Sequence, residues 1–148
     1  MPTATVYLSL GTNLGDKSWN IREAVRLIGE RVGRVMKESP VIETEPWGFH
    51  SDSSFLNACI EVATLLSPRC VLKVTQQIER QLGRTQKSVD GVYHDRLIDI
   101  DILLYGDLTM DEPDLKIPHP LMYERDFVMI PLKEIRRPLP SPPRDGRE

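Results

Sequence analysis

Two aspartates separated by one residue are the side chains in this sequence best placed to do chemistry. Asp99 and Asp101 lie in the segment 96–102, where they alternate with isoleucines. In a strand, alternate residues face the same side, so both carboxylates would lie on one face, with Cα atoms roughly 6.5 to 7 Å apart. Such a pair can bind one Mg²⁺ ion or two ions. The alternative is a strand face that is simply acidic, but two uncompensated like charges are costly, which favours a metal site.

Basic residues surround this acidic pair in the sequence. Arg84, Lys87 and Arg96 precede it, and Arg125 follows it. The planar guanidinium group matches phosphate oxygens with two hydrogen bonds. Carboxylates that hold Mg²⁺, together with several arginines, are the components of a phosphoryl-transfer site. The alternative is that these arginines belong to a solvated surface.

A second group of residues could bind a flat heterocycle. Phe55 and Asn57 would share one face of a strand, so that an aromatic ring lies beside an amide that both donates and accepts. Trp47 and Phe49, in the preceding loop, could close over such a ligand. The alternative is that Phe55 belongs to the core and Asn57 is an internally satisfied polar group.

Two other motifs are less informative. The glycine-bracketed loop 11–16 lacks the Lys-Ser/Thr ending of a P-loop, so a P-loop is excluded. His119 lies between two prolines and could contact a phosphate or simply pack. The sequence leaves this choice open.

The elements that must position these residues follow from hydrophobic periodicity. Strands are predicted over 5–10, 55–65 and 97–105, with weaker alternation over 35–44, where Pro40 indicates an edge or a bulge. One helix is predicted from near Ser18. A second begins at Ser67, has Pro68 in its first turn and ends at Gly83 in a left-handed conformation.

The order of strand, helix, strand, strand, helix, strand predicts an α+β, ferredoxin-like sandwich. Its antiparallel sheet would carry helices on one face and the site on the other side. The segment 84–95 is polar and aperiodic, which predicts a long loop. From Pro113 onward the prolines predict irregular structure with at most short helices. We expect a single domain over 1–148, with an irregular proline-rich tail from about residue 136.

Composition narrows the class of protein. The chain has 148 residues, 40% of them hydrophobic, and a net charge of −3, which disfavours nucleic acid and membrane surfaces as partners. No transmembrane run or secretion signal is found, and the histidines lack zinc-site spacing. Cys59 and Cys70 are predicted to be buried apolar residues. We expect a cytoplasmic monomer that acts on small molecules.

Taken in order, several motifs resemble those of the 6-hydroxymethyl-7,8-dihydropterin pyrophosphokinase family of folate biosynthesis. They extend over nearly the whole chain, from about Thr5 to about Ile135. They are Gly-Thr-Asn-Leu-Gly-Asp (11–16), Glu-Thr-Glu-Pro-Trp-Gly (43–48), Phe-Leu-Asn-Ala (55–58), Gln-Ile-Glu-Arg-Gln-Leu-Gly-Arg (77–84), Asp-Arg-Leu-Ile-Asp-Ile-Asp-Ile-Leu-Leu-Tyr-Gly (95–106) and Ile-Pro-His-Pro (117–120).

The resemblance implies that the pterin hydroxyl attacks the β-phosphorus of MgATP and that AMP leaves. By similarity to the family, Asp99 and Asp101 would bind two Mg²⁺ ions and, with Arg84 and Arg96, form the catalytic set. The implied pterin-binding residues are Asn13, Thr44, Pro46, Trp47, Phe55, Asn57 and Phe127. The implied ATP-binding residues are Gln76, Glu79, Arg84, Arg96, Ile102, His119 and Arg125. The loop 84–95 would act as a lid that excludes water.

Two other functions are alternatives. A non-catalytic ferredoxin-like module that binds a nucleotide would not need a pair of metal-binding carboxylates, a strand face that binds a pterin, or a lid. A metal-dependent phosphohydrolase that uses Asp99 and Asp101 would not need Phe55 and Asn57 arranged for a heterocycle. The presence of all these features favours the pyrophosphokinase.

Overall fold

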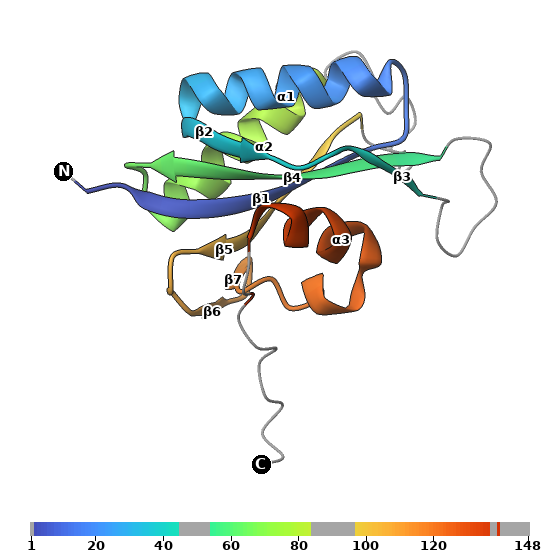
Figure 1. The fold of residues 1–148 in the computed structure, drawn as a ribbon. Coiled ribbons are helices and arrows are strands. Elements are labelled where there is room, and N and C mark those ends of the chain that lie inside the picture. Colours follow the sequence, from blue (N-terminus) through green and yellow to red (C-terminus); the bar gives the residue numbers. More distant parts are fainter. Residues whose placement is uncertain (1, 45–53, 84–96, 137–138, 140–148) are drawn as a thin grey trace.

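An antiparallel sheet organises the chain. The computed structural model describes residues 2–44, 54–83, 97–136 and 139. The strands of the main sheet are β1 (Ala4–Thr12), β2 (Gly33–Glu38), β3 (Ile42–Thr44), β4 (Phe55–Thr64) and β5 (Asp99–Tyr105). Their order is β2-β4-β1-β5, with β3 paired to β4, and every pairing is antiparallel. This order confirms the predicted ferredoxin-like α+β class (Figure 1).

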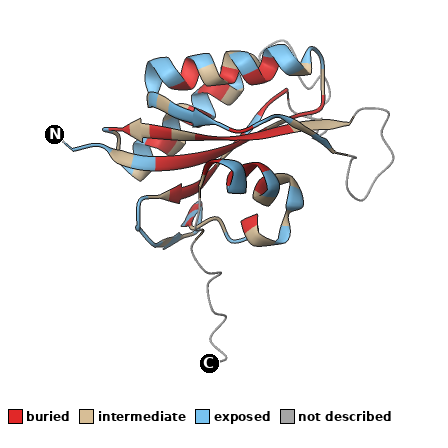
Figure 2. Cartoon of the chain, viewed as in Figure 1, coloured by how far each residue is buried: buried red, intermediate tan, exposed pale blue. Residues whose placement is uncertain are grey.

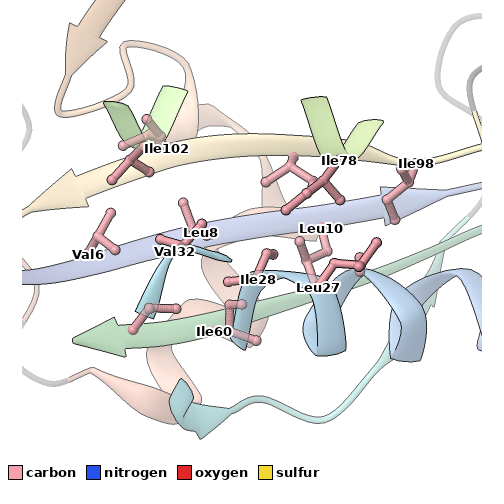
Figure 3. Close-up of a cluster of buried hydrophobic side chains, with 14 of the residues drawn as sticks. Val6, Leu8, Leu10, Leu27, Ile28, Val32, Ile60, Ile78, Ile98 and Ile102 are labelled. Carbon is pink, nitrogen blue, oxygen red and sulfur yellow. The ribbon is translucent and has the colours of Figure 1, made fainter. Parts of the chain in front are cut away.

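The helices α1 (Lys17–Arg31) and α2 (Pro68–Leu82) cover one face of the sheet (Figure 1). Alternate residues of β1, β4 and β5 meet the apolar stripes of both helices in one continuous core. Figure 3 labels ten members of this cluster: Val6, Leu8, Leu10, Leu27, Ile28, Val32, Ile60, Ile78, Ile98 and Ile102. The isoleucines of the acidic segment are therefore core residues, as their alternation predicts.

Both helices begin at side-chain caps. The carboxylate of Asp16 accepts from the backbone N–H of Trp19 at 3.0 Å, and the hydroxyl of Ser67 accepts from that of Cys70 at 3.2 Å. At the other end of α2 the prediction of a left-handed Gly83 is wrong, because its φ is −89°. The Gly83 N–H still donates to the carbonyl of Glu79 at 2.9 Å, so the helix closes without a left-handed residue.

The opposite face of the sheet is partly covered by a helix that the sequence analysis did not predict. α3 (Asp126–Ile135) has ten residues, with Pro131 inside it, so the expectation of only short helices beyond Pro113 is wrong. Val128, Leu132 and Ile135 pack in a second core cluster against the sheet (Figure 1). The proline removes one helical donor, but Pro131 is itself buried, and this packing maintains the helix.

Along the chain, a hairpin and a 3-10 helix lie between β5 and α3. β6 (Met110–Glu112) and β7 (Leu115–Ile117) form a separate two-stranded hairpin, followed by the 3-10 helix η1 (Met122–Glu124). Figure 2 shows that buried residues concentrate in the strands and on the helix surfaces that face them. The described part of the chain contains no helix long and apolar enough to cross a membrane.

The two cysteines differ in environment. Cys59 is fully buried beneath α3, and burial raises the pKa of its thiol to about 12. Cys70 is exposed in the first turn of α2, so the prediction that it is buried is wrong. The periodicity of α2 assigns its buried stripe to Val71, Thr75 and Ile78 instead.

Candidate active site

The candidate site is built on the face of the sheet that α3 shares. In the register of the sheet, Gly11 of β1 lies between Asn57 of β4 and Asp99 of β5. Cross-strand partners in an antiparallel sheet point to the same face, so the amide and the carboxylate lie on one side. Two strand spacings separate them by about 10 Å. The sheet therefore places Asn57, which is predicted to bind a heterocycle, and Asp99, which is predicted to bind a metal ion, in one row on the same face.

Gly11 leaves room for the Asn57 amide at the centre of this row. A Cβ atom there would lie 2.9 Å from Oδ1 of Asn57, closer than real Cβ contacts come. The sequence analysis ended this strand at Leu10, whereas β1 continues through Gly11 to Thr12. The absence of a side chain at Gly11 leaves the sheet backbone open between Asn57 and Asp99.

The structure brings three predicted pterin-site residues together. Asn57 is 4% exposed, and its Nδ2 donates to Oγ1 of Thr44 at 3.0 Å. Thr44 is paired with Phe55 in the β3–β4 ladder, so the ring and the hydroxyl share one face. This hydrogen bond uses one amide hydrogen of Asn57, and the Oδ1 of the same amide lies beside Gly11.

Asn13, just beyond β1, is a buried amide with an unused donor. It is 1% exposed, and its Nδ2 has no hydrogen-bond partner among the described residues. A buried donor left without a partner costs about 1 to 3 kcal/mol. The chemistry of this donor fits a ligand that brings an acceptor, such as a ring nitrogen or an exocyclic oxygen.

Phe127 and Arg125 come from the start of α3. The Arg125 guanidinium carbon lies 5.6 Å from the centroid of the Phe127 ring, which is cation–π distance. Phe127 also packs against the second core cluster, which includes Tyr7 and Cys59 of the sheet. An aromatic ring and a cation are thus placed on the same side of the sheet as Asn57.

The two aspartates lie on the predicted face of β5. Asp101 pairs with the buried Ser9 of β1, and Asp99 pairs with Gly11. Asp99 is exposed and Asp101 is partly buried. In the described ranges 2–44, 54–83 and 97–136, no cluster of three or more His, Cys, Asp or Glu residues could hold a metal ion. Two carboxylates fit Mg²⁺ in particular, because it completes its shell with water and substrate phosphates.

His119 lies beside Asp101 and Arg125. Burial lowers the pKa of His119 below its ordinary value of 6.5, the Asp101 carboxylate opposes this shift, and the Arg125 guanidinium adds to it. The imidazole is therefore mainly neutral at pH 7. Its Nδ1 accepts from the backbone N–H of Leu121 at 3.2 Å, so Nε2 carries the proton and is a donor.

A cleft of about 240 Å³ runs along the outer edge of β5 beside Asp101. It is lined by α2, β5, the β6–β7 hairpin and the segment that follows the hairpin. The lining residues are Leu72, Ile100, Asp101, Ile102, Pro113, Asp114, Leu115, Lys116, His119 and Pro120. Its lining is partly apolar, from residues such as Leu72, Ile100 and Leu115, and partly polar, with Asp101 and His119 on one side.

Two of the predicted ATP-binding residues, Ile102 and His119, line this cleft. The side chain of Ile102 also belongs to the main core. Oε2 of Glu79 accepts from the backbone N–H of Ile100 at 2.7 Å, which fastens α2 to the edge strand. Gln76 is exposed on α2 and is not among the lining residues. Arg84, Arg96, Pro46 and Trp47, together with the predicted lid, lie outside the described residues, so their roles stay predictions.

Other residues of the site were not found from the sequence. Gly11 could have been identified from the alternation of β1, because it continues the face of Tyr7 and Ser9. The hairpin residues Pro113 and Leu115 gave no such signal, because their position at the cleft depends on packing against α2 and β5.

The comparisons with known proteins agree with this geometry. Residues 7–137 match the family described as 7,8-dihydro-6-hydroxymethylpterin-pyrophosphokinase. The 2-amino-4-hydroxy-6-hydroxymethyldihydropteridine pyrophosphokinase of Porphyromonas gingivalis is 52% identical over 133 residues, covering 89% of this chain and 90% of that protein. The Bacillus subtilis protein of the same name is 42% identical over 130 residues, covering 87% of this chain and 76% of that protein.

Solved structures agree on the fold. Wild-type HPPK-DHPS of Plasmodium falciparum superposes with a TM-score of 0.72 at 17% identity, covering 89% of this chain. This chain spans only 41% of that longer protein, and the likeness shows the shared fold alone. The match over residues 7–137 and the identities of the bacterial relatives decide the assignment. The chain belongs to the 7,8-dihydro-6-hydroxymethylpterin-pyrophosphokinase family.

Proposed function

We propose that this chain transfers a diphosphoryl group from MgATP to 6-hydroxymethyl-7,8-dihydropterin, in folate biosynthesis. The hydroxymethyl oxygen forms a bond to the β-phosphorus, and the bond from that phosphorus to the oxygen of the α-phosphate breaks. AMP leaves, and the hydroxyl proton is released. The observation that carries the proposal is the row Asn57–Gly11–Asp99 in the sheet. In this row, an amide that can hydrogen-bond a heterocycle and a carboxylate that can bind Mg²⁺ lie on the same face.

The pterin would lie over Gly11. Asn57 and Thr44 would hydrogen-bond the ring edge, and Asn13 would donate its unused amide hydrogen. Phe55 and Phe127 would hold the two faces of the ring. By the sequence resemblance, Pro46 and Trp47 would also contact the pterin. This orientation directs the hydroxymethyl group toward β5.

ATP would occupy the cleft beside β5. The apolar lining from Leu72, Ile100 and Leu115 suits the base, and the phosphates would extend toward His119 and Arg125. His119 contributes an Nε2–H donor and Arg125 contributes a permanent positive charge. Ile102 lines this cleft and Glu79 bonds to the backbone of Ile100 beside it. By the sequence resemblance, Gln76, Arg84 and Arg96 would also contact the nucleotide.

Asp99 and Asp101 would hold Mg²⁺, and two ions are proposed. Held by these carboxylates, Mg²⁺ would neutralise charge on the triphosphate and would make the substrate hydroxyl more acidic. The residues of the chain supply position rather than a nucleophile. They orient the hydroxyl at the phosphorus and offer donors and cations where negative charge develops.

The protein is proposed to work as a monomer. The large hydrophobic residues that are exposed in the described part belong to separate segments, including Trp19 of α1, Met36 of β2 and Ile130 of α3. A cytoplasmic location is also proposed, on the ground that the reaction consumes ATP.

Product analysis tests the reaction. The protein is incubated with MgATP, with and without the hydroxymethyl-dihydropterin, and the nucleotide products are separated by chromatography. We expect AMP only when the pterin is present. Formation of ADP, or turnover that does not need the pterin, would indicate a phosphohydrolase or another kinase. ATP binding without turnover would indicate the non-catalytic nucleotide-binding module.

Substitution of the carboxylates tests the metal assignment. Asp99→Asn and Asp101→Asn keep the shape of each side chain but remove its charge, so each should reduce turnover at least about a hundredfold. Asp107→Asn is the matched control, because Asp107 is exposed in the turn after β5 and outside the site. Near-normal turnover in either site variant, at saturating Mg²⁺, would refute the metal assignment.

A further inference from the structure

One arginine connects two walls of the cleft. Arg69 lies in the first turn of α2, and its Nη1 donates to Oδ2 of Asp114 at 2.8 Å. Its Nη2 contacts the carboxylate of Glu112. Glu112 ends β6 and Asp114 lies in the turn that joins β6 to β7. A single guanidinium thus joins helix α2 to the β6–β7 hairpin.

These two elements face each other across the cleft. From α2 comes Leu72, which is one turn beyond Arg69 and therefore on the same side of the helix. From the hairpin come Pro113, Asp114 and Leu115. Arg69 is not itself a lining residue, so its effect on a ligand would act through the distance between the two walls.

The hairpin needs such support at its turn. A two-stranded hairpin is marginally stable by itself. Leu115 and Ile117 anchor β7 in the main core, being 5% and 1% exposed, but the side chains of Asp114 and Glu112 are 65% and 45% exposed. Arg69 also lowers the pKa of Asp114, first by its hydrogen bond and then by its charge, against the opposing effect of burial.

We propose that Arg69 is a positioning and specificity-determining residue for the nucleotide. It sets the gap between Leu72 and the hairpin, where the base of the nucleotide binds. The inference rests on the proposed function for the location of ATP in this cleft. It goes beyond that function because it assigns base selectivity to the ion pairs of Arg69 with Glu112 and Asp114, which we call the clamp. Arg69 itself does not line the cleft.

Equilibrium binding measures how Arg69 affects the affinity for nucleotides, and this measurement does not depend on turnover. MgATP and MgGTP are titrated separately into wild type and Arg69→Ala by calorimetry. Exposed ion pairs are individually weak, so we expect the Kd for ATP to rise about fivefold in the variant. We expect the preference for ATP over GTP to fall by a similar factor, because a looser gap discriminates less between bases.

Steady-state kinetics separate positioning from general damage. In Arg69→Ala, KM for ATP should rise, while kcat and KM for the pterin stay within about twofold of wild type. Arg26→Ala is the matched control. Arg26 also lies between two carboxylates, those of Glu23 and Glu30, but within α1 and away from the cleft. It should leave both nucleotide constants unchanged.

A charge exchange tests the clamp directly. Arg69→Glu alone places a third carboxylate beside Glu112 and Asp114, and should weaken ATP binding more than Arg69→Ala does. The double variant Arg69→Glu, Glu112→Arg returns a guanidinium between two carboxylates and leaves every lining residue intact. It should recover most of the ATP affinity and the preference over GTP.

The outcomes are distinguishable from those of the proposed function. Three results would each overturn the proposed role of Arg69. They are unchanged nucleotide Kd values in Arg69→Ala, an equal rise of KM for ATP and for the pterin in that variant, and no recovery of ATP affinity in the double variant. A wild type that does not bind MgATP would also overturn this role. If wild type binds ATP but forms no AMP with the pterin, the proposed reaction fails while the binding measurements still decide the role of Arg69.

Discussion

At the scale of single residues, the buried amide of Asn20 connects segments that lead to the site. Its Nδ2 donates to Oγ1 of Thr12 at 3.1 Å and to the carbonyl oxygens of Leu14 and Leu97 at 2.9 and 3.3 Å. Asn20 is 4% exposed. Leu97 lies two residues before Asp99, so this amide fixes the start of β5 relative to the end of β1.

We expect Asn20→Ala to reduce the free energy of unfolding by about 1 to 3 kcal/mol, because buried carbonyls lose their donor. Turnover should also fall, because the start of β5 is held less firmly near Asp99. Denaturant unfolding and kcat measure the two effects. Asn20→Asp, which replaces the donor with an acceptor, should be at least as destabilising. A free energy of unfolding equal to that of wild type in both variants would contradict this role.

Tyr7 gives a prediction about alkaline pH. Burial, together with a hydrogen bond at 2.5 Å to Glu61 and the charge of that carboxylate, raises its pKa from 10.0 to about 12, although Arg136 opposes the shift. The folded state therefore favours the protonated phenol. Its stabilising contribution is complete below pH 10 and is lost as the pH rises from 10 to about 12.

We expect the free energy of unfolding of wild type to fall over this interval, and to fall less in Tyr7→Phe. Tyrosinate absorbance provides a second measurement, because the variant should lack the one phenol whose pKa is raised to about 12. If the absorbance difference between the two proteins titrates near pH 10, the raised pKa of Tyr7 is refuted.

At the scale of elements, α3 connects the second core to the site. Leu132 is fully buried against the sheet, while Arg125 and Phe127 lie at the beginning of the same helix. The sequence carried a signal for this helix in the spacing of Val128, Leu132 and Ile135, which are four and three residues apart. The prolines concealed it, because Pro131 lies within the pattern.

Leu132→Ala should reduce the free energy of unfolding by about 2 to 5 kcal/mol, because it leaves a cavity between α3 and the sheet. Pterin affinity should fall as well, since Phe127 depends on the position of the helix. Ile130→Ala is the matched control in the same helix, because Ile130 is 52% exposed, and it should change stability by less than about 0.5 kcal/mol. Equal effects of the two substitutions would show that α3 is not held by this packing.

At the scale of the whole molecule, one sheet separates two cores and carries the site at its β5 side. The larger core lies beneath α1 and α2, and the smaller one lies beneath α3 (Figures 1 and 2). The strand order β2-β4-β1-β5 puts β1 in contact with both β4 and β5. Residues far apart in the sequence, such as Asn57 and Asp99, become neighbours across β1 for this reason.

Periodicity predicted β1, β4, β5 and the first two helices because each has a clear apolar stripe, whereas the short strands β6 and β7 were not predicted. It also placed Asp99 and Asp101 on one face, since that depends only on the alternation of a strand. Errors arose where tertiary packing overrode local signals. α3 persists through Pro131, Gly83 ends α2 without a positive φ, and Cys70 points to solvent.

The sequence by itself determined the fold class, the family resemblance and the residue types whose chemistry suits a metal, a phosphate and a heterocycle. Only the tertiary structure decided how these residues combine. It placed Gly11 between Asn57 and Asp99, set His119 beside Asp101, and closed the cleft with a hairpin held by Arg69. The physical reason is that strand pairing and long-range ion pairs join segments whose contacts are not encoded in any local pattern.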